Sequence, residues 1–138
     1  MPDAVAWTED LREALLDAAR LASPREVVAV LGGDCGADTT SVTAFVEVEN
    51  VARGDGRFGV DPGAFAAVEQ QLRRRGCTFV GFAHSHPRGA AAPSASDRDE
   101  LWSGCVQLIV AGDDVRAYWL DRARAVHALP LRLEEPVR

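Results

Sequence analysis

Residues 77–87 read CTFVGFAHSHP, an apolar run that leads directly into two histidines and a proline. The first seven residues have the length and the aromatic and β-branched content of a buried strand. Side chains at positions i and i+2 of an extended segment project to the same side, so His84 and His86 would aim their imidazoles at one point. Pro87 stiffens the exit and disfavours a helical conformation at His86. This stretch therefore predicts a strand whose end presents two histidines.

A third metal ligand is expected at Asp97, which follows His86 by 11 residues. A small-residue loop separates the two, and the aspartate would lie in the first turn of a short helix predicted over 95–102. Two neutral imidazoles and one carboxylate leave the fourth tetrahedral position of a zinc ion open for water, as in catalytic sites. Zinc lowers the pKa of such a water toward ~7. The sequence thus predicts one catalytic Zn²⁺ held by His84, His86 and Asp97.

A zinc hydrolase also needs a proton carrier and a donor for the tetrahedral oxyanion, and Glu26 and Ser94 are the candidates. Ser94 precedes Asp97 by three residues, whereas Glu26 competes with the other acidic residues among a total of 21. Other interpretations stay open at this point. Ser94 and Asp97 could form no more than a helix cap, and Glu26 could be an ordinary strand residue.

The segment from His84 to Asp97 has the spacing H-x-H-P-x(6)-S-x-x-D. It resembles the JAMM motif of the JAB1/MPN/Mov34 metallopeptidases. Residues 24–33 read PREVVAVLGG and are similar to the family's glutamate segment, P-x-E-x-x-G-x-L-x-G, with Ala29 in place of the frequent glycine. The resemblance covers about residues 9–120. It implies a single-domain MPN/JAB-type α/β fold, a mixed β-sheet flanked by helices and distantly similar to the cytidine deaminases.

The resemblance also implies a role for each site residue. His84, His86 and Asp97 would bind zinc, Glu26 would be the general acid/base, and Ser94 would hydrogen-bond the oxyanion. Compact members of the family resemble the archaeal desampylases, which remove ubiquitin-like small modifier proteins from lysine conjugates or linear fusions after a C-terminal Gly-Gly. These modifiers and their conjugates are the expected partners.

Three alternative functions compete with this one. The same chemistry could process sulfur-carrier proteins beyond their Gly-Gly end. A non-catalytic MPN scaffold is a different class, although such members usually lack a ligand and none is missing here. A zinc deaminase needs H-x-E with P-C-x-x-C, and this chain has neither.

The remaining elements follow from hydrophobic periodicity and capping signals. Residues 1–138 are expected to form one domain, with an order of helix, two strands, helix, strand, helix and a final hairpin. The predicted elements are a helix at 9–21 capped by Thr8, a strand at 26–31 closed by Gly32 and Gly33, a polar loop at 34–40, a strand at 40–48 with Val42, Ala44, Val46 and Val48 on one face, a helix from Asp61-Pro62 to Arg75, strands at 106–111 and 115–120, and a tail at 129–138 that is an edge strand or frayed.

Composition limits the partners and the location that are expected for this chain. The net charge of −6 disfavours a nucleic-acid partner. Neither an apolar run long enough to span a membrane nor a signal peptide is evident, so a cytoplasmic location is expected. All 15 basic residues are arginine, so no side chain can accept an isopeptide bond. No zinc-knuckle spacing is present among Cys35, Cys77 and Cys105. Cys105 is expected to be buried, and a Cys35–Cys77 disulfide bond is left open.

Overall fold

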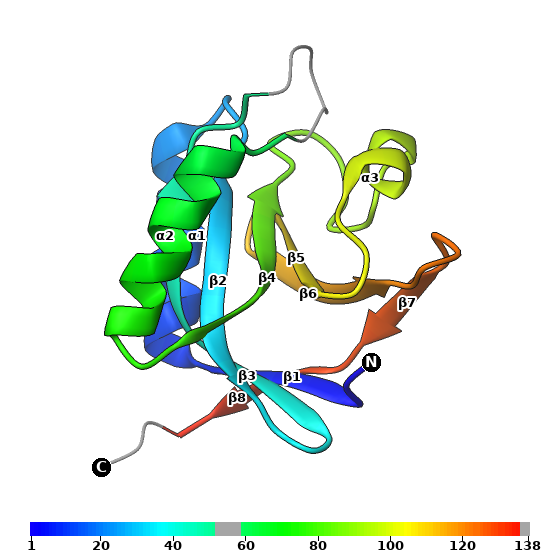
Figure 1. The fold of residues 1–138 in the computed structure, drawn as a ribbon. Helices are drawn as coiled ribbons and strands as arrows, with labels where there is room; N and C mark the ends of the chain where they lie inside the picture. The colour runs from blue at the N-terminus through cyan, green and yellow to red at the C-terminus, as the bar shows by residue number, and fades with distance from the viewer. Residues whose placement is uncertain (52–58, 136–138) are drawn as a thin grey trace.

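The chain folds around one eight-stranded mixed sheet with strand order β7-β6-β5-β4-β2-β3-β1-β8 (Figure 1). The computed structural model describes residues 1–51 and 59–135. The predicted α/β class with a mixed sheet flanked by helices is confirmed. In chain order the elements are β1 (Ala4–Thr8), α1 (Glu9–Ala22), β2 (Val28–Cys35), β3 (Thr39–Val48), α2 (Pro62–Arg74), β4 (Thr78–Ser85), α3 (Ala95–Glu100), β5 (Val106–Ala111), β6 (Asp114–Leu120), β7 (Val126–Leu129) and β8 (Leu131–Glu134).

The two longer helices begin where their capping residues predict. The Thr8 side chain accepts a hydrogen bond from the Leu11 amide at 3.3 Å, and the Asp61 carboxylate accepts one from the Ala64 amide at 2.9 Å. Pro62 occupies the first helical position of α2, where a missing amide hydrogen costs nothing. Both helices are confirmed within one residue of the predicted bounds.

Helices cover both faces of the sheet, because the central strand β2 is apolar on both sides. Ala29 and Leu31 belong to the core cluster that contains the buried leucines of α1. Val28 and Val30 alternate with them and belong to the cluster that contains the buried residues of α2. Because successive strand residues point to opposite faces, α1 and α2 lie on opposite sides of the sheet.

The sequence prediction for the β2–β3 hairpin was wrong in length. The two glycines do not close β2, which continues to Cys35, while β3 begins at Thr39. The expected loop at 34–40 is therefore reduced to residues 36–38. Gly33 is required inside the strand, since a Cβ atom there would lie 1.8 Å from the Ser41 carbonyl oxygen.

A bulge in the same hairpin changes which residues of β3 share a face. Gly32 pairs with Ala44 and Gly33 with Val42, so Thr43 is an extra residue in β3. The predicted single apolar face is therefore wrong at Val42. Val42 packs in the α1 cluster, whereas the other three residues pack against the α2 cluster: Ala44, Val46 and Val48.

Both ends of the chain contribute strands. The short strands β1 and β7 were not predicted, and β1 connects β3 to the edge strand β8. Of the two alternatives for the tail, the edge strand is confirmed over Leu131–Glu134, while residues 136–138 lie outside the described residues. All three cysteines are free thiols, so the open Cys35–Cys77 bridge is not formed, and Cys105 is buried. Among the described residues no helix is long and apolar enough to cross a membrane.

Candidate metal centre

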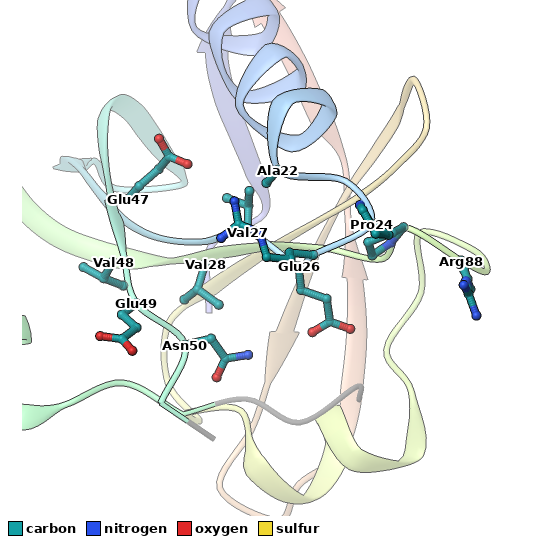
Figure 2. Close-up of a pocket in the computed structure, with 12 residues that line it drawn as sticks. Ala22, Pro24, Glu26, Val27, Val28, Glu47, Val48, Glu49, Asn50 and Arg88 are labelled. Atoms are coloured by element: carbon teal, nitrogen blue, oxygen red, sulfur yellow. The ribbon is translucent and has the colours of Figure 1, made fainter. Parts of the chain in front are cut away.

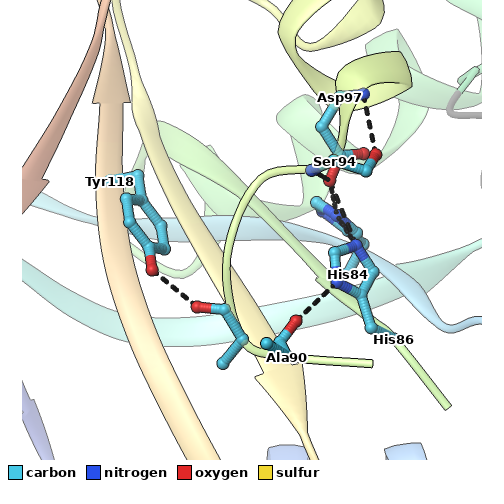
Figure 3. Close-up of polar contacts among 7 residues, drawn as sticks. His84, His86, Ala90, Ser94, Asp97 and Tyr118 are labelled. Atoms are coloured by element: carbon cyan, nitrogen blue, oxygen red, sulfur yellow. Dashed lines mark hydrogen bonds and ion pairs between the residues drawn. The ribbon is translucent and has the colours of Figure 1, made fainter. Parts of the chain in front are cut away.

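The end of β4 and the start of α3 bring three potential ligand atoms together (Figure 3). His84 Nε2 lies 3.1 Å from His86 Nε2 and 3.2 Å from Asp97 Oδ2, and His86 Nε2 lies 3.1 Å from the same Oδ2. Zinc bonds of about 2.0–2.1 Å in a tetrahedron would place ligand atoms about 3.3 Å apart. The three atoms therefore fit one face of a tetrahedral zinc site.

Asp97 is held in this position by the cap of α3. The Ser94 hydroxyl oxygen accepts a hydrogen bond from the Asp97 amide at 3.1 Å, and Asp97 Oδ2 accepts one from the Ser94 amide at 2.9 Å. Ser94 and Asp97 therefore do cap α3, and Asp97 contacts the two histidines at the same time. Because the Ser94 oxygen acts as an acceptor in the cap, its O–H remains a donor for another group.

His86 is oriented by a backbone carbonyl in the loop that follows it. Its Nδ1 lies 2.9 Å from the Ala90 carbonyl oxygen, which can only accept, so Nδ1 carries the proton. The neutral ring then presents an unprotonated Nε2 to the other two ligand atoms. Fixing the tautomer of a metal-binding histidine in this way is a general feature of such sites.

The electrostatics of the triad favour a cation. Burial opposes ionisation of Asp97, which is only 2% exposed, but hydrogen bonds with His84 and His86 outweigh this effect and hold the pKa of Asp97 well below its ordinary value. The hydrogen bond with Asp97 raises the pKa of His86, against the opposing effect of burial. An ionised, almost fully buried carboxylate beside two imidazoles can hold either a proton or a metal ion.

Glu26 lies two residues before β2, opposite the end of β4. Val28 pairs with His84 in the antiparallel ladder, so Glu26 falls opposite His86 when the register is continued. The position is fixed by two hydrogen bonds between the intervening residues: the Ser85 amide donates to the Val27 carbonyl at 3.0 Å, and the Val27 amide donates to Ser85 Oγ at 2.8 Å. The charge of Glu26 also contributes to the raised pKa of His86.

A cavity of about 890 Å³ opens beside this glutamate (Figure 2). Glu26, Pro87 and Arg88 line it, whereas none of His84, His86 and Asp97 is among the lining residues that the structure describes. Figure 2 shows Glu47 and Glu49 along the opposite wall. The cavity is thus a space large enough for an extended peptide segment, and Glu26, which lies opposite His86 in the continued register, lines it.

Sequence reasoning missed the supporting residues of the site. Ser85 has no predicted role beyond separating the two histidines, although its buried hydroxyl oxygen accepts a hydrogen bond from the Val27 amide. Tyr118 has no predicted role either, yet its hydroxyl donates to the Ala91 carbonyl at 2.6 Å in the loop after His86. The sequence does contain one indication of this bond. Tyr118 is the only tyrosine of the chain and lies in a predicted strand, and the hydroxyl of a buried tyrosine usually needs a hydrogen-bond partner.

The fold and this arrangement of side chains are those of a JAB-type domain. Residues 8–121 match the family model described as prokaryotic homologs of the JAB domain, and the chain belongs to this family. A desampylase of Haloferax volcanii is 37% identical over 110 residues, which cover 75% of this chain and 78% of the relative.

Solved structures support the same fold. A protein of Desulfitobacterium hafniense superposes with a TM-score of 0.85 at 24% identity and covers 96% of this chain and 94% of its own. A JAB1/MPN domain protein of Archaeoglobus fulgidus superposes with a TM-score of 0.57 at 20% identity and covers 95% of this chain and 99% of its own. At these identities the likeness concerns the fold alone.

Proposed function

We propose that this chain is a zinc-dependent isopeptidase that removes ubiquitin-like small modifier proteins from lysine conjugates or linear fusions, cleaving after a C-terminal Gly-Gly. The observation that carries the proposal is the convergence of His84, His86 and Asp97, with Glu26 opposite His86 in the continued register and lining an open cavity. The relative named desampylase supports the substrate class. The unit of activity in this proposal is a single domain formed by residues 1–138.

Each residue would have a distinct role. His84, His86 and Asp97 would hold a single zinc ion, which supplies Lewis acidity that favours ionisation of water near neutral pH. The Glu26 carboxylate would accept a proton from the attacking water and pass it to the leaving amine. The Ser94 hydroxyl would donate a hydrogen bond to the developing oxyanion, a contact typically worth about 3–4 kcal/mol.

The cavity suggests how a substrate would be presented. Extended tails bind many proteins by pairing their backbone with an exposed strand or loop, and a Gly-Gly end is slender enough to enter a narrow groove. Residues 88–93, which follow the histidine pair, would form one wall. The lysine-free sequence means that the enzyme could process lysine conjugates without offering an acceptor side chain of its own.

The test is cleavage of two matched substrates, a modifier joined through Gly-Gly to a lysine side chain and the same modifier in a linear fusion. Release of free modifier should require zinc, stop with a chelator and return when zinc is restored. Glu26→Gln should lose activity while retaining zinc and fold. Glu13→Gln, on the exposed surface of α1, is the matched control and should cleave normally. Full activity of Glu26→Gln would remove this glutamate from the mechanism.

The alternatives predict different outcomes in the same assay. A processing peptidase for sulfur-carrier proteins would cut only residues that extend linearly beyond Gly-Gly. A non-catalytic scaffold would cut neither substrate, and metal analysis would find no zinc. The cytoplasmic location and the lack of a nucleic-acid partner stay predictions from the sequence.

A further inference from the structure

We propose that Tyr118 is a positioning residue for the metal centre, because its hydroxyl fixes the loop backbone that sets the tautomer of His86. The inference rests on the proposed metal-binding function. Tyr118 touches none of the three ligands. It acts through two successive carbonyl groups: its hydroxyl donates to the Ala91 oxygen at 2.6 Å, and His86 Nδ1 donates to the Ala90 oxygen at 2.9 Å (Figure 3).

The loop has little of its own to hold it in place. Residues 88–93 read RGAAAP, so four of the six positions are glycine or alanine. Gly89 has a φ of +110°, in the region that favours glycine, and Ala90 is exposed. Ala91 packs in an apolar cluster, but the other small side chains of the loop offer little packing area, so hydrogen bonds to the backbone carry much of its order.

Tyr118 is itself held rigidly. It lies on β6 between β5 and β7, paired with Gln107 and Ala128. Its ring belongs to a small apolar cluster with Ala91 and Ile109, and the hydrogen bond to Ala91 is buried. Ile109 is the parallel-strand partner of His84. One cluster therefore joins the strand that neighbours the first histidine to the loop that orients the second.

Loss of the tyrosine hydroxyl would release the peptide plane next to the Ala90 carbonyl. The His86 ring would then lose a fixed acceptor at Nδ1, and part of the neutral population would place its proton on Nε2 instead. That tautomer cannot coordinate a metal through Nε2 until its proton moves. Burial raises the pKa of Tyr118, which keeps the hydroxyl a donor at neutral pH.

The variant Tyr118→Phe removes this one hydroxyl and retains the ring. Thr78→Val is the matched control, because Thr78 also donates a hydroxyl to a backbone carbonyl, that of Gly33 at 3.0 Å, but at the start of β4, the opposite end from the ligands. Zinc affinity is measured by competition with a chromogenic chelator. Losing a group that hydrogen-bonds a metal-binding histidine directly costs about 10–100-fold in metal affinity. Tyr118 acts one hydrogen bond further from the histidine, so Tyr118→Phe should lower zinc affinity by about 3–10-fold. The control should bind zinc as the wild type does.

A second measurement separates positioning from general stability. Nitrogen-15 spectra of the metal-free protein, at a pH where the imidazole is neutral, report which ring nitrogen of His86 carries the proton. The wild type and Thr78→Val should show the Nδ1–H tautomer, and Tyr118→Phe a mixture.

The outcomes distinguish the two proposals. If the wild type does not bind zinc, the proposed function fails before Tyr118 is at issue. If the wild type binds zinc but Tyr118→Phe keeps its affinity and the His86 tautomer, the positioning role is overturned. A metal-free wild type whose His86 carries its proton on Nε2 would overturn it as well, and this measurement needs no variant that must fold.

Discussion

Replacing Ser85 with alanine should damage the site without touching a proposed ligand. The Ser85 oxygen is buried and accepts the Val27 amide at 2.8 Å, so Ser85→Ala leaves a buried N–H without its acceptor. An unsatisfied buried donor costs about 1–3 kcal/mol, and we expect a loss of about 2 kcal/mol in the free energy of unfolding. The same bond holds the residue next to Glu26. A displacement of about 1 Å at a catalytic group can cost about 100-fold in rate, so activity should fall by more than stability alone explains.

The assay combines urea unfolding of the zinc-loaded protein with cleavage kinetics at a temperature where both proteins are fully folded. Ser85→Thr, which keeps a hydroxyl, should recover part of both losses, and Thr78→Val reports the cost of losing a hydroxyl bond far from the site. Because the hydrogen bond from Val27 to Ser85 holds the backbone next to Glu26, Ser85→Ala should have a lower kcat with little change in zinc affinity. Unchanged kcat in Ser85→Ala, together with the expected loss of stability, would show that this hydroxyl supports the fold only.

Three further predictions concern the metal, pH and the bulged hairpin. Removing zinc should lower the midpoint of thermal unfolding, because a ligand present at about 1,000 times its Kd stabilises the native state by about 4 kcal/mol; an identical midpoint with and without chelator would contradict a bound ion. In the metal-free protein the raised pKa of His86 stabilises the fold below its ordinary value of 6.5, and this stabilisation is lost as pH rises through the raised pKa. The lowered pKa of Asp97 stabilises the fold above 3.8 and is lost at lower pH, so urea titrations should place the optimum for this pair between pH 3.8 and 6.5, whereas zinc binding should weaken on acidification. Gly33→Ala should destabilise the protein by more than about 2 kcal/mol, since its Cβ would overlap the Ser41 carbonyl oxygen; a loss below 0.5 kcal/mol, within the usual range for harmless substitutions, would show that the hairpin relaxes freely.

The elements that local sequence patterns specify were predicted closely. Strand alternation predicts that the side chains of His84 and His86 point to one side, and the S-x-x-D spacing specifies a cap that fixes Asp97. Convergence of the three ligand atoms could therefore be predicted, while the roles of Glu26 and Ser94 in catalysis stay predictions.

Features that depend on distant residues could not be predicted. The extra residue at Thr43 lies where Gly33 closely approaches the neighbouring strand, and the sequence around Val42 alternates as if no bulge were present. The hydrogen bond between Tyr118 and the Ala91 carbonyl joins positions 27 residues apart, and backbone acceptors have no sequence signature. The strand β1 is five residues long, and its last residue is also the cap of α1. Its apolar run is too short to be recognised as a strand distinct from the start of the helix.

The double use of Asp97 affects how catalytic competence should be recognised in related genomes. The spacing from Ser94 to Asp97 is also the spacing of an ordinary helix cap, and both cap hydrogen bonds are present here. A descendant that had lost its metal would still need this serine and aspartate to begin the helix, so selection for folding alone would preserve them. The two histidines take no part in this cap. A survey that separates active enzymes from inactive descendants should therefore give most weight to the histidine pair and little to the serine and aspartate.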